Sequence, residues 1–268
     1  MPSTMSWHFY GLFGSNGFYL TGFISKPSRY CNEWSIIGSI FNTVRLCMKL
    51  LALETANEQC SVSIVDETQT LYFQLDTRAK AQTQTILPMI ELGFEQNQIS
   101  SKDLTAIAFS RGPGSFSGVR INAAVTQALA WANDIPVIPV STLQALAQAA
   151  YQQAQLTEVT AVLDARMQEV YMASFKLDQN NIMQLVDEEK LLDYQHAAEY
   201  QKYTLIGSGS ALVNVEAIAF QQITASANDI ATIARQNALQ KQWLSAEQAL
   251  PVYLRDNAWK KIPEQGKP

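Results

Sequence analysis

The segment LTAIAFSRGPGSFSGV, residues 104–119, determines the fold that we predict for this chain. Its apolar start, through Ile107 and Phe109, predicts a buried strand, and a loop with three glycines and a proline follows. From Val119 onward, apolar residues recur at the spacing of one helix face. A glycine loop between a strand and a helix lets the backbone approach a phosphate or a partner closely, because glycine lacks a Cβ and the helix N-terminus carries partial positive charge.

The loop lacks the sequence motifs of three large enzyme classes. No Gly-Lys-Ser/Thr ending is present, so it is not a P-loop. A nucleophile elbow needs glycine two residues before its serine, but Pro113 precedes Ser115 and Ser115 precedes Ser117 at that distance. The third residue after Gly114 is Ser117, which also excludes a dinucleotide-binding G-x-G-x-x-G motif.

Two arginines flank the loop, and a guanidinium group binds phosphate or a partner's carboxylate with two parallel hydrogen bonds. The alternative is that the loop is a tight turn that packs the helix on the strand. The loop residues that we consider for a cleft or a nucleotide-proximal site are Arg111, Gly112, Gly114, Ser115, Ser117, Gly118 and Arg120.

The flanking sequence extends this unit to a β-β-β-α-β-α-β-α order. Upstream we expect strands at Lys49–Leu53, Ser61–Val65 and Leu71–Leu75, then a helix at Thr83–Phe94. Pro88 either kinks that helix or marks a later start. Downstream we expect a strand at Pro136–Val140 and a helix at Thr142–Gln153.

The second half of the chain begins with strands again. A hairpin is expected from Val159 to Phe175, and Thr204–Ile206 is a strand that leads into another glycine loop. A helix is expected over about residues 226–240, while residues 176–203 are polar and show no clear period. Both halves therefore open with strands and reach a strand followed by a glycine loop, which is weak support for a duplicated, two-lobed α/β fold.

Two turns carry further candidate site residues. The turn after the first strand holds Glu54 and Thr55 but no glycine, so its backbone cannot approach a triphosphate as closely as a glycine-containing turn does. The tip of the second hairpin holds Asp164 and Arg166, which either pair with each other or face a cleft. For the first turn, an ordinary solvated turn is an equal alternative.

Composition limits the possible functions. The 268 residues carry a net charge of −5, and because residues 1–47 carry +2, residues 48–268 carry −7. A chain that grips nucleic acid alone needs clustered Lys and Arg, so an acidic body argues against that role. No long apolar run resembles a membrane span. The three cysteines share no CxxC spacing, which is typical of a reduced, cytoplasmic protein.

Only two histidines are present, His8 and His196, without paired spacing. A histidine-based zinc site, a Ser-His-Asp triad recognisable from local motifs and a Cys-His dyad are therefore disfavoured. His196 lies in a polar stretch and is expected to be an ordinary surface residue. We predict no metal site on this chain.

Residues 1–47 differ in character from the rest, and Met48 opens the first predicted strand. We expect residues 1–47 to be an atypical extension that is disordered or belongs to a misassigned start; a genuine N-terminal arm is the alternative. Residues 48–155 are expected to form the first lobe and residues 156–268 the second. The helix near 226–240 is expected to pack back on the first lobe, and the chain is expected to end in an extended basic tail.

The helix at Thr83–Phe94 has apolar residues over more than one stripe. Its members include Leu87, Met89, Ile90 and Phe94, and methionine suits adaptable contact surfaces. A helix that is apolar on two faces needs a second partner besides its own core, although burial of all these residues in that core is the simpler alternative.

From Met48 to Lys261 the chain resembles the TsaB family of tRNA threonylcarbamoyladenosine biosynthesis proteins. The segments that carry the resemblance are Leu50–Ala56, Ile86–Met89, Gly112–Arg120, Val140–Leu143, Asp164–Met167, Glu169–Tyr171 and Pro251–Arg255. The departures are small: Glu54 replaces the usual Asp, Ser117 the usual Thr, and Gln82 a frequent His. Seven blocks in the same order make the resemblance specific, and residues 1–47 lie outside it.

The resemblance implies an α/β, two-lobed actin/Hsp70-like (ASKHA) fold with a mixed sheet and helices in each lobe. It also implies a non-catalytic subunit for threonylcarbamoyl transfer to N6 of adenosine 37 in tRNAs that read codons beginning with adenine. The related catalytic subunit, TsaD, has a metal-binding histidine pair that would fall near Ser141 and Ala145, where this chain has no histidine.

The resemblance further implies direct binding to TsaD, with the ATPase TsaE in a ternary complex, and contact with tRNA through the complex. ATP or ADP and metal are expected on the partner subunits, with no cofactor on this chain alone. The contact is expected on the first two helices, through Thr83, Ile86, Leu87, Met89, Ile90, Val119, Ala123 and Thr126. A homodimer through the same helices stays open.

Two other functions stay as alternatives. An active phosphotransferase of the same fold would need a glycine in the first turn and a catalytic acid facing the cleft, and that glycine is missing. A serine peptidase built on Ser115 or Ser117 would need a base that the sequence does not place.

Overall fold

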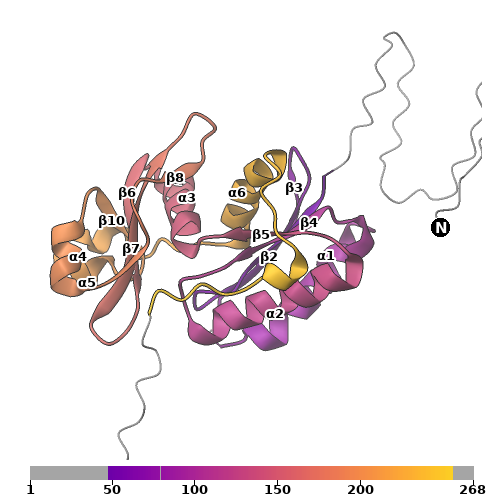
Figure 1. Cartoon of the computed structure of the whole chain (residues 1–268), viewed down its shortest axis with the longest axis horizontal. Helices are drawn as coiled ribbons and strands as arrows, with labels where there is room; N and C mark the ends of the chain where they lie inside the picture. The colour runs from indigo at the N-terminus through magenta and orange to yellow at the C-terminus, as the bar shows by residue number, and fades with distance from the viewer. Residues whose placement is uncertain (1–47, 79, 256–268) are drawn as a thin grey trace, which may run out of the picture.

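The computed structural model describes residues 48–78 and 80–255, which form two lobes side by side (Figure 1). Each lobe is built on one five-stranded sheet that mixes parallel and antiparallel pairs. The predicted two-lobed α/β fold with a mixed sheet in each lobe is confirmed. The expected N-terminal extension and the basic end of the tail lie outside the described residues.

The sheet of the first lobe has the strand order β3-β2-β1-β4-β5. Its strands are β1 Leu50–Glu54, β2 Cys60–Val65, β3 Thr70–Asp76, β4 Ala106–Ser110 and β5 Val137–Val140. The first three pair antiparallel, while β1, β4 and β5 run parallel. Strands β1, β2 and β4 are buried along their whole length, because helices cover both faces of the sheet.

Helices α1 Gln82–Gln96 and α2 Phe116–Asn133 cover one face of this sheet (Figure 1). Pro88 lies inside α1, so the helix begins well before it and the alternative of a later start is wrong. Helix α2 begins three residues earlier than its apolar pattern indicated, because the Ser115 side chain caps it by accepting a hydrogen bond from the Gly118 N–H.

The sheet of the second lobe has the order β10-β6-β7-β8, with β9 also paired to β7. Its strands are β6 Glu158–Asp164, β7 Glu169–Leu177, β8 Met183–Leu185, β9 Lys190–Asp193 and β10 Thr204–Ile206. The short helices α4 Tyr194–Tyr200 and α5 Ser210–Val213 lie against it, and the 3-10 turns are η1 Ser101–Asp103, η2 Val215–Phe220 and η3 Ala246–Gln248.

Helices α3 Thr142–Ala154 and α6 Ala227–Leu239 lie between the two sheets (Figure 1). Helix α3 contacts strands of the second sheet, and α6 packs on the first sheet although it follows the second lobe in sequence. Their alanine-rich faces join both sheets into one apolar core, which includes Leu50, Leu146, Phe175 and Ile230. The lobes therefore share buried surface.

Most strands and helices were predicted to within two or three residues of their bounds. The segment 176–203, which showed no period, contains β8, β9 and α4. These elements are too short for a periodic pattern to be recognised. Among the described residues, no helix combines the length and the apolar character that a bilayer crossing requires.

Candidate functional site

The turn after β1 packs directly on the glycine loop that precedes α2. The Thr55 hydroxyl donates to the Gly118 carbonyl at 2.7 Å, and the Ser115 N–H donates to the Ala56 carbonyl at 2.7 Å. Two predicted site segments, 63 residues apart in sequence, are thus brought together. A phosphate-binding loop directs its backbone N–H groups at the ligand. In this loop the Ser115 N–H is instead directed at a carbonyl oxygen of the protein itself.

The loop glycines are required by this contact. A Cβ on Gly118 would lie 1.9 Å from the Thr55 carbonyl oxygen, and one on Gly114 would lie 2.4 Å from the Ala56 carbonyl oxygen. Gly112 adopts a left-handed φ of +102°, and a Cβ there would lie 2.9 Å from the Val252 carbonyl oxygen. The tight-turn alternative therefore describes this loop: its glycines make room for the chain itself.

Glu54 is the most perturbed acid of this junction. Its side chain is fully buried, and burial raises the pKa of its carboxyl to about 7. One carboxyl oxygen accepts the Ala56 N–H at 2.6 Å, while the other has no hydrogen-bond partner among the described residues. Asp229, which caps α6 beneath the sheet, is also buried, and desolvation raises its pKa to about 6.

A segment near the end of the described chain crosses the same loop and ties it to the second lobe. The Val252 N–H donates to the Arg111 carbonyl at 2.7 Å. Arg255 then donates to the Ala165 carbonyl at 3.2 Å and pairs with Glu169, both on the β6–β7 hairpin. Arg111 itself forms a 3.0 Å ion pair with Glu189 of the second lobe. The inner side of the loop is therefore occupied by protein contacts between lobes.

Arg120 lies on the outer side of the loop instead. Its guanidinium carbon is 3.6 Å from the centre of the Phe116 ring and 5.8 Å from the centre of the Tyr253 ring. Its Nε donates to the Tyr253 hydroxyl at 2.9 Å. The sequence pattern indicated Arg120 but not its two aromatic neighbours, because Tyr253 lies 133 residues away and no local pattern links them.

Asp164 and Arg166, at the tip of the β6–β7 hairpin, form a 3.1 Å ion pair, as the simpler interpretation of that turn predicted. Arg166 also lies 3.8 Å from Glu58 in the first lobe. Residues 166–168 all have left-handed φ values between 57° and 62°, a conformation that side chains with a Cβ disfavour. The Met167 side chain is 80% exposed at this tip.

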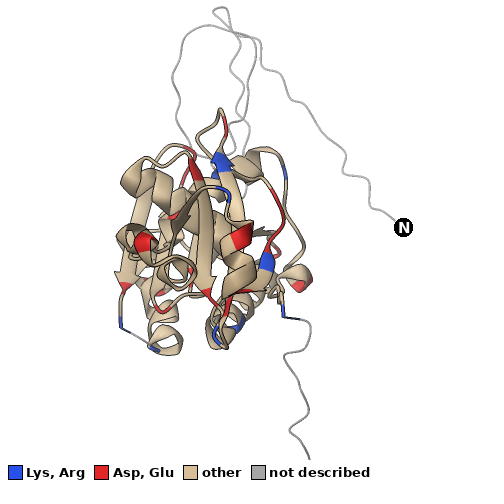
Figure 2. Cartoon of the chain, turned by 90° about the vertical axis from the view of Figure 1, so that its left-hand side faces the viewer, with Lys and Arg blue, Asp and Glu red and all other residues tan. Residues whose placement is uncertain are grey.

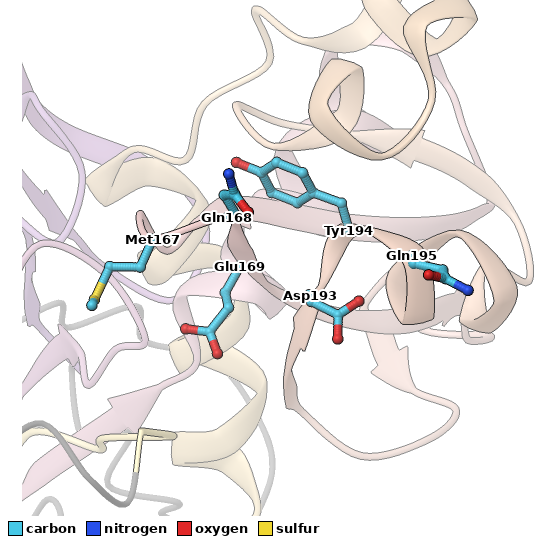
Figure 3. A pocket seen from close by; sticks show the side chains of 6 residues that line it. All are labelled: Met167, Gln168, Glu169, Asp193, Tyr194 and Gln195. Carbon is cyan, nitrogen blue, oxygen red and sulfur yellow. The ribbon is translucent and has the colours of Figure 1, made fainter.

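A pocket of about 410 Å³ lies beside this hairpin (Figure 3). It is lined by Met167, Gln168, Glu169, Asp193, Tyr194 and Gln195. Both of its acids already have partners: Glu169 pairs with Arg255, and Asp193 binds the His196 ring and caps α4. The hydrogen bond to the His196 N–H is the main cause that lowers the pKa of Asp193. No sequence pattern indicated this pocket, and its residues offer no free acid or base.

The serines of the loop lack the setting of a nucleophile. The Ser115 hydroxyl caps α2, and neither Ser115 nor Ser117 has a hydrogen bond to a basic or acidic side chain within residues 48–78 and 80–255. His196 is exposed on the second lobe and bound to Asp193, as expected for a surface residue. No group of three or more His, Cys, Asp or Glu in the described part of the chain is arranged to hold a metal ion.

For six of the eight residues predicted to contact a partner, the structure contradicts the prediction. Six side chains are buried against their own lobe: Ile86, Met89, Ile90, Val119, Ala123 and Thr126. They face the sheet because α1 and α2 must cover its apolar strands. Thr83 and Leu87 are exposed, and the exposed stripe of α2 includes Phe116, Arg120, Ala124, Ala128 and Trp131.

Charged residues of the second lobe are scattered along the chain. In the view of this lobe, short basic and acidic segments lie apart on the ribbon (Figure 2). Several cations, such as Lys176, Lys190 and Lys202, lie within 4.0 Å of a carboxylate. The pairing of these cations agrees with the acidic composition of the chain.

Comparisons with known proteins give one consistent result. Residues 76–262 match the family model of TsaD, described as tRNA N6-adenosine threonylcarbamoyltransferase. The tRNA threonylcarbamoyladenosine biosynthesis protein TsaB of Escherichia coli K12 is 37% identical over 81% of this chain and 99% of its own length. TsaB of Haemophilus influenzae is 33% identical over 81% and 98%. The structure of YeaZ from Pseudomonas aeruginosa superimposes with a TM-score of 0.71 at 34% identity, covering 77% of this chain and 100% of that one.

Proposed function

Because this chain belongs to the TsaB family of tRNA threonylcarbamoyladenosine biosynthesis proteins, we propose that it acts as the non-catalytic subunit of this modification. In this proposal TsaD binds the chain directly, and TsaE joins the pair in a ternary complex. The complex then transfers threonylcarbamoyl to N6 of adenosine 37 in tRNAs that read codons beginning with adenine. ATP or ADP and metal are held by the partner subunits, and the complex works in the cytoplasm.

The closed junction between the first turn and the glycine loop is the observation that carries the non-catalytic role. A phosphate at the N-terminus of α2 needs free N–H groups and space. Here the Ser115 N–H is bonded to Ala56, and Gly118 contacts the Thr55 carbonyl. The Glu54 carboxyl is fully buried and has no contact with solvent, so it cannot contact a substrate.

The outer face of α1 and α2 supports the partner role. Leu87 on α1 is 54% exposed, and Trp131 on α2 is 66% exposed. Large apolar side chains on neighbouring helices of one face are typical of protein contact surfaces. The acidic body supports tRNA contact through the complex rather than by this chain alone.

The test combines co-purification with nucleoside analysis. Tagged chain is co-expressed with TsaD of the same organism, and tRNA from cells depleted of the chain is digested and analysed by mass spectrometry. We expect a stable complex and loss of threonylcarbamoyladenosine on depletion. Normal levels of the modified nucleoside together with no complex would overturn the proposal.

The phosphotransferase alternative has its own readout. The purified chain is assayed alone for ATP hydrolysis and for nucleotide binding by calorimetry. We expect neither activity, because the junction leaves no free phosphate-binding loop. Turnover of ATP that Glu54→Gln abolishes would favour the alternative.

A further inference from the structure

We propose that Arg120 is a pre-positioned anchor that binds a carboxylate group of the TsaD subunit, an inference that rests on the proposed function. Its guanidinium lies over the Phe116 ring, 3.6 Å from the ring centre, and beside the Tyr253 ring, 5.8 Å from that centre. The Tyr253 hydroxyl accepts only the Nε–H. The four N–H bonds of the two terminal nitrogens remain for a ligand on the outer side.

Arg120 differs from the other arginines within residues 48–78 and 80–255. Four of them pair with carboxylates inside the chain: Arg78, Arg111, Arg166 and Arg255. Arg235 donates to two backbone carbonyls. Arg120 alone has neither kind of partner there, although its side chain is held in place by two rings and a hydrogen bond. A held guanidinium loses less conformational entropy on binding than a free one.

The surroundings of Arg120 favour a protein carboxylate over an RNA phosphate. It is the single basic residue of α1 and α2, and α1 carries the exposed acids Glu91 and Glu95. RNA binding through phosphates needs several cations together. The exposed stripe of α2 beyond Arg120 is apolar, with Ala124, Ala128 and Trp131.

The residue types around Arg120 are typical of a protein interface in which a few residues provide most of the binding energy. Arginine, tyrosine and tryptophan are the residue types that most often dominate the binding energy of protein interfaces. Planar recognition of a carboxylate by two parallel N–H groups is a property of arginine that lysine lacks. The proposal therefore predicts that charge alone at position 120 does not restore binding.

The experiment measures TsaD binding by the full chain in wild-type and variant forms. The wild type, Arg120→Gln and Arg120→Lys are compared by surface plasmon resonance against immobilised TsaD. We expect Arg120→Gln to raise Kd at least about tenfold, mainly through faster dissociation, because the partner's buried carboxylate loses its pair. We expect Arg120→Lys to recover only a small part of the loss. The matched control, Arg166→Gln, removes an exposed and paired arginine elsewhere and should leave Kd unchanged.

Acidic residues on the TsaD surface are then replaced one at a time in wild-type and Arg120→Gln backgrounds. One replacement should weaken the wild type but not the variant, which identifies the paired carboxylate. Unfolding curves of all variants should coincide with the wild type, since Arg120 is exposed.

The outcomes separate this inference from the proposed function. If wild-type chain does not bind TsaD, the proposed function fails first. If it binds TsaD and Arg120→Gln binds equally well, the anchor is wrong while the function stands. A loss confined to tRNA binding by the assembled complex would identify an RNA phosphate instead, and a loss confined to self-association in sedimentation would identify a second copy of this chain; both overturn the proposal.

Discussion

The two lobes contain the same junction, a hairpin turn against a glycine loop, with different consequences. In the first lobe Gly112, at φ +102°, begins the loop that packs on the β1–β2 turn. In the second lobe Gly207, at φ +88°, begins a loop in which the Gly209 N–H donates to the Val162 carbonyl at 3.1 Å. Both loops come after a strand that pairs parallel with the first strand of its lobe.

The helix after each loop differs between the lobes. In the first lobe it is the 18-residue helix α2, which covers the sheet and still has an exposed outer stripe. In the second lobe it is the four-residue helix α5. The turns differ as well, because Glu54 is fully buried whereas Met167 is 80% exposed. Both lobes therefore form the same junction from the same order of strand, turn and glycine loop. The length of the helix that follows the loop decides whether the lobe has an exposed helical face.

The largest expected effect tests how much the stability of the first lobe depends on the sides of α1 and α2 that face the sheet. Ile90 on α1 is 3% exposed within the apolar core under α1 and α2. Ile90→Asp buries an unpaired charge there and should lower the free energy of unfolding by about 4 kcal/mol or more. Urea denaturation followed by circular dichroism measures this change.

The matched control is Leu87→Asp on the same helix, where the side chain is 54% exposed. It should change stability by less than about 0.5 kcal/mol and, under the proposed function, weaken TsaD binding. A well-folded Ile90→Asp protein would show that the inner side of α1 does not form a core contact with the sheet.

The next effect compares the two junctions directly. A Cβ on Gly118 would lie 1.9 Å from the Thr55 carbonyl oxygen. A Cβ on Gly209 would lie 2.7 Å from a Val162 methyl carbon and 3.0 Å from the nearest backbone atom, the Leu163 carbonyl carbon. Gly118→Ala should therefore cost about 3 kcal/mol of unfolding free energy, because the overlap with backbone is severe, and Gly209→Ala about 1 kcal/mol, because a smaller shift relieves its contacts. Thermal and urea unfolding of both variants measure the difference. Equal costs would mean that the two junctions are equally tight.

The smallest effect concerns the buried acid that distinguishes the first turn. Burial raises the pKa of Glu54 to about 7 from an ordinary 4.5, so the folded state holds this proton to higher pH than the unfolded state. The contribution of Glu54 to stability is therefore full below pH 4.5 and falls as pH rises to 7. Between about pH 5 and pH 8 the wild type should lose about 2 kcal/mol more than Glu54→Gln.

Urea denaturation of both proteins at the two pH values measures this difference. Asp229 is present in both, so its own raised pKa cancels in the comparison. Parallel pH dependence of the two proteins would contradict the assignment of the proton to Glu54.

The sequence by itself determined the fold class, the strands around residues 104–119 and the glycine loop. These depend on local patterns: an apolar run, three closely spaced glycines and helical spacing after them. The pair of Asp164 and Arg166 was one of the two alternatives that the sequence left open, because they lie two residues apart at one turn, and the structure shows the pair. The segments that resemble the TsaB family are likewise visible in the sequence alone.

Only the tertiary structure decided which way each of these residues faces. The periodicity of α1 marks Ile86 and Ile90 as apolar, but it does not say whether a sheet or a partner covers them. The glycines allow close approach in general, yet the atom that approaches Gly118 is the Thr55 carbonyl, from 63 residues away. The pairing of Arg120 with Tyr253 spans 133 residues. Contacts at such separations depend on how the lobes pack, because burial is a property of the assembled core and not of any local pattern.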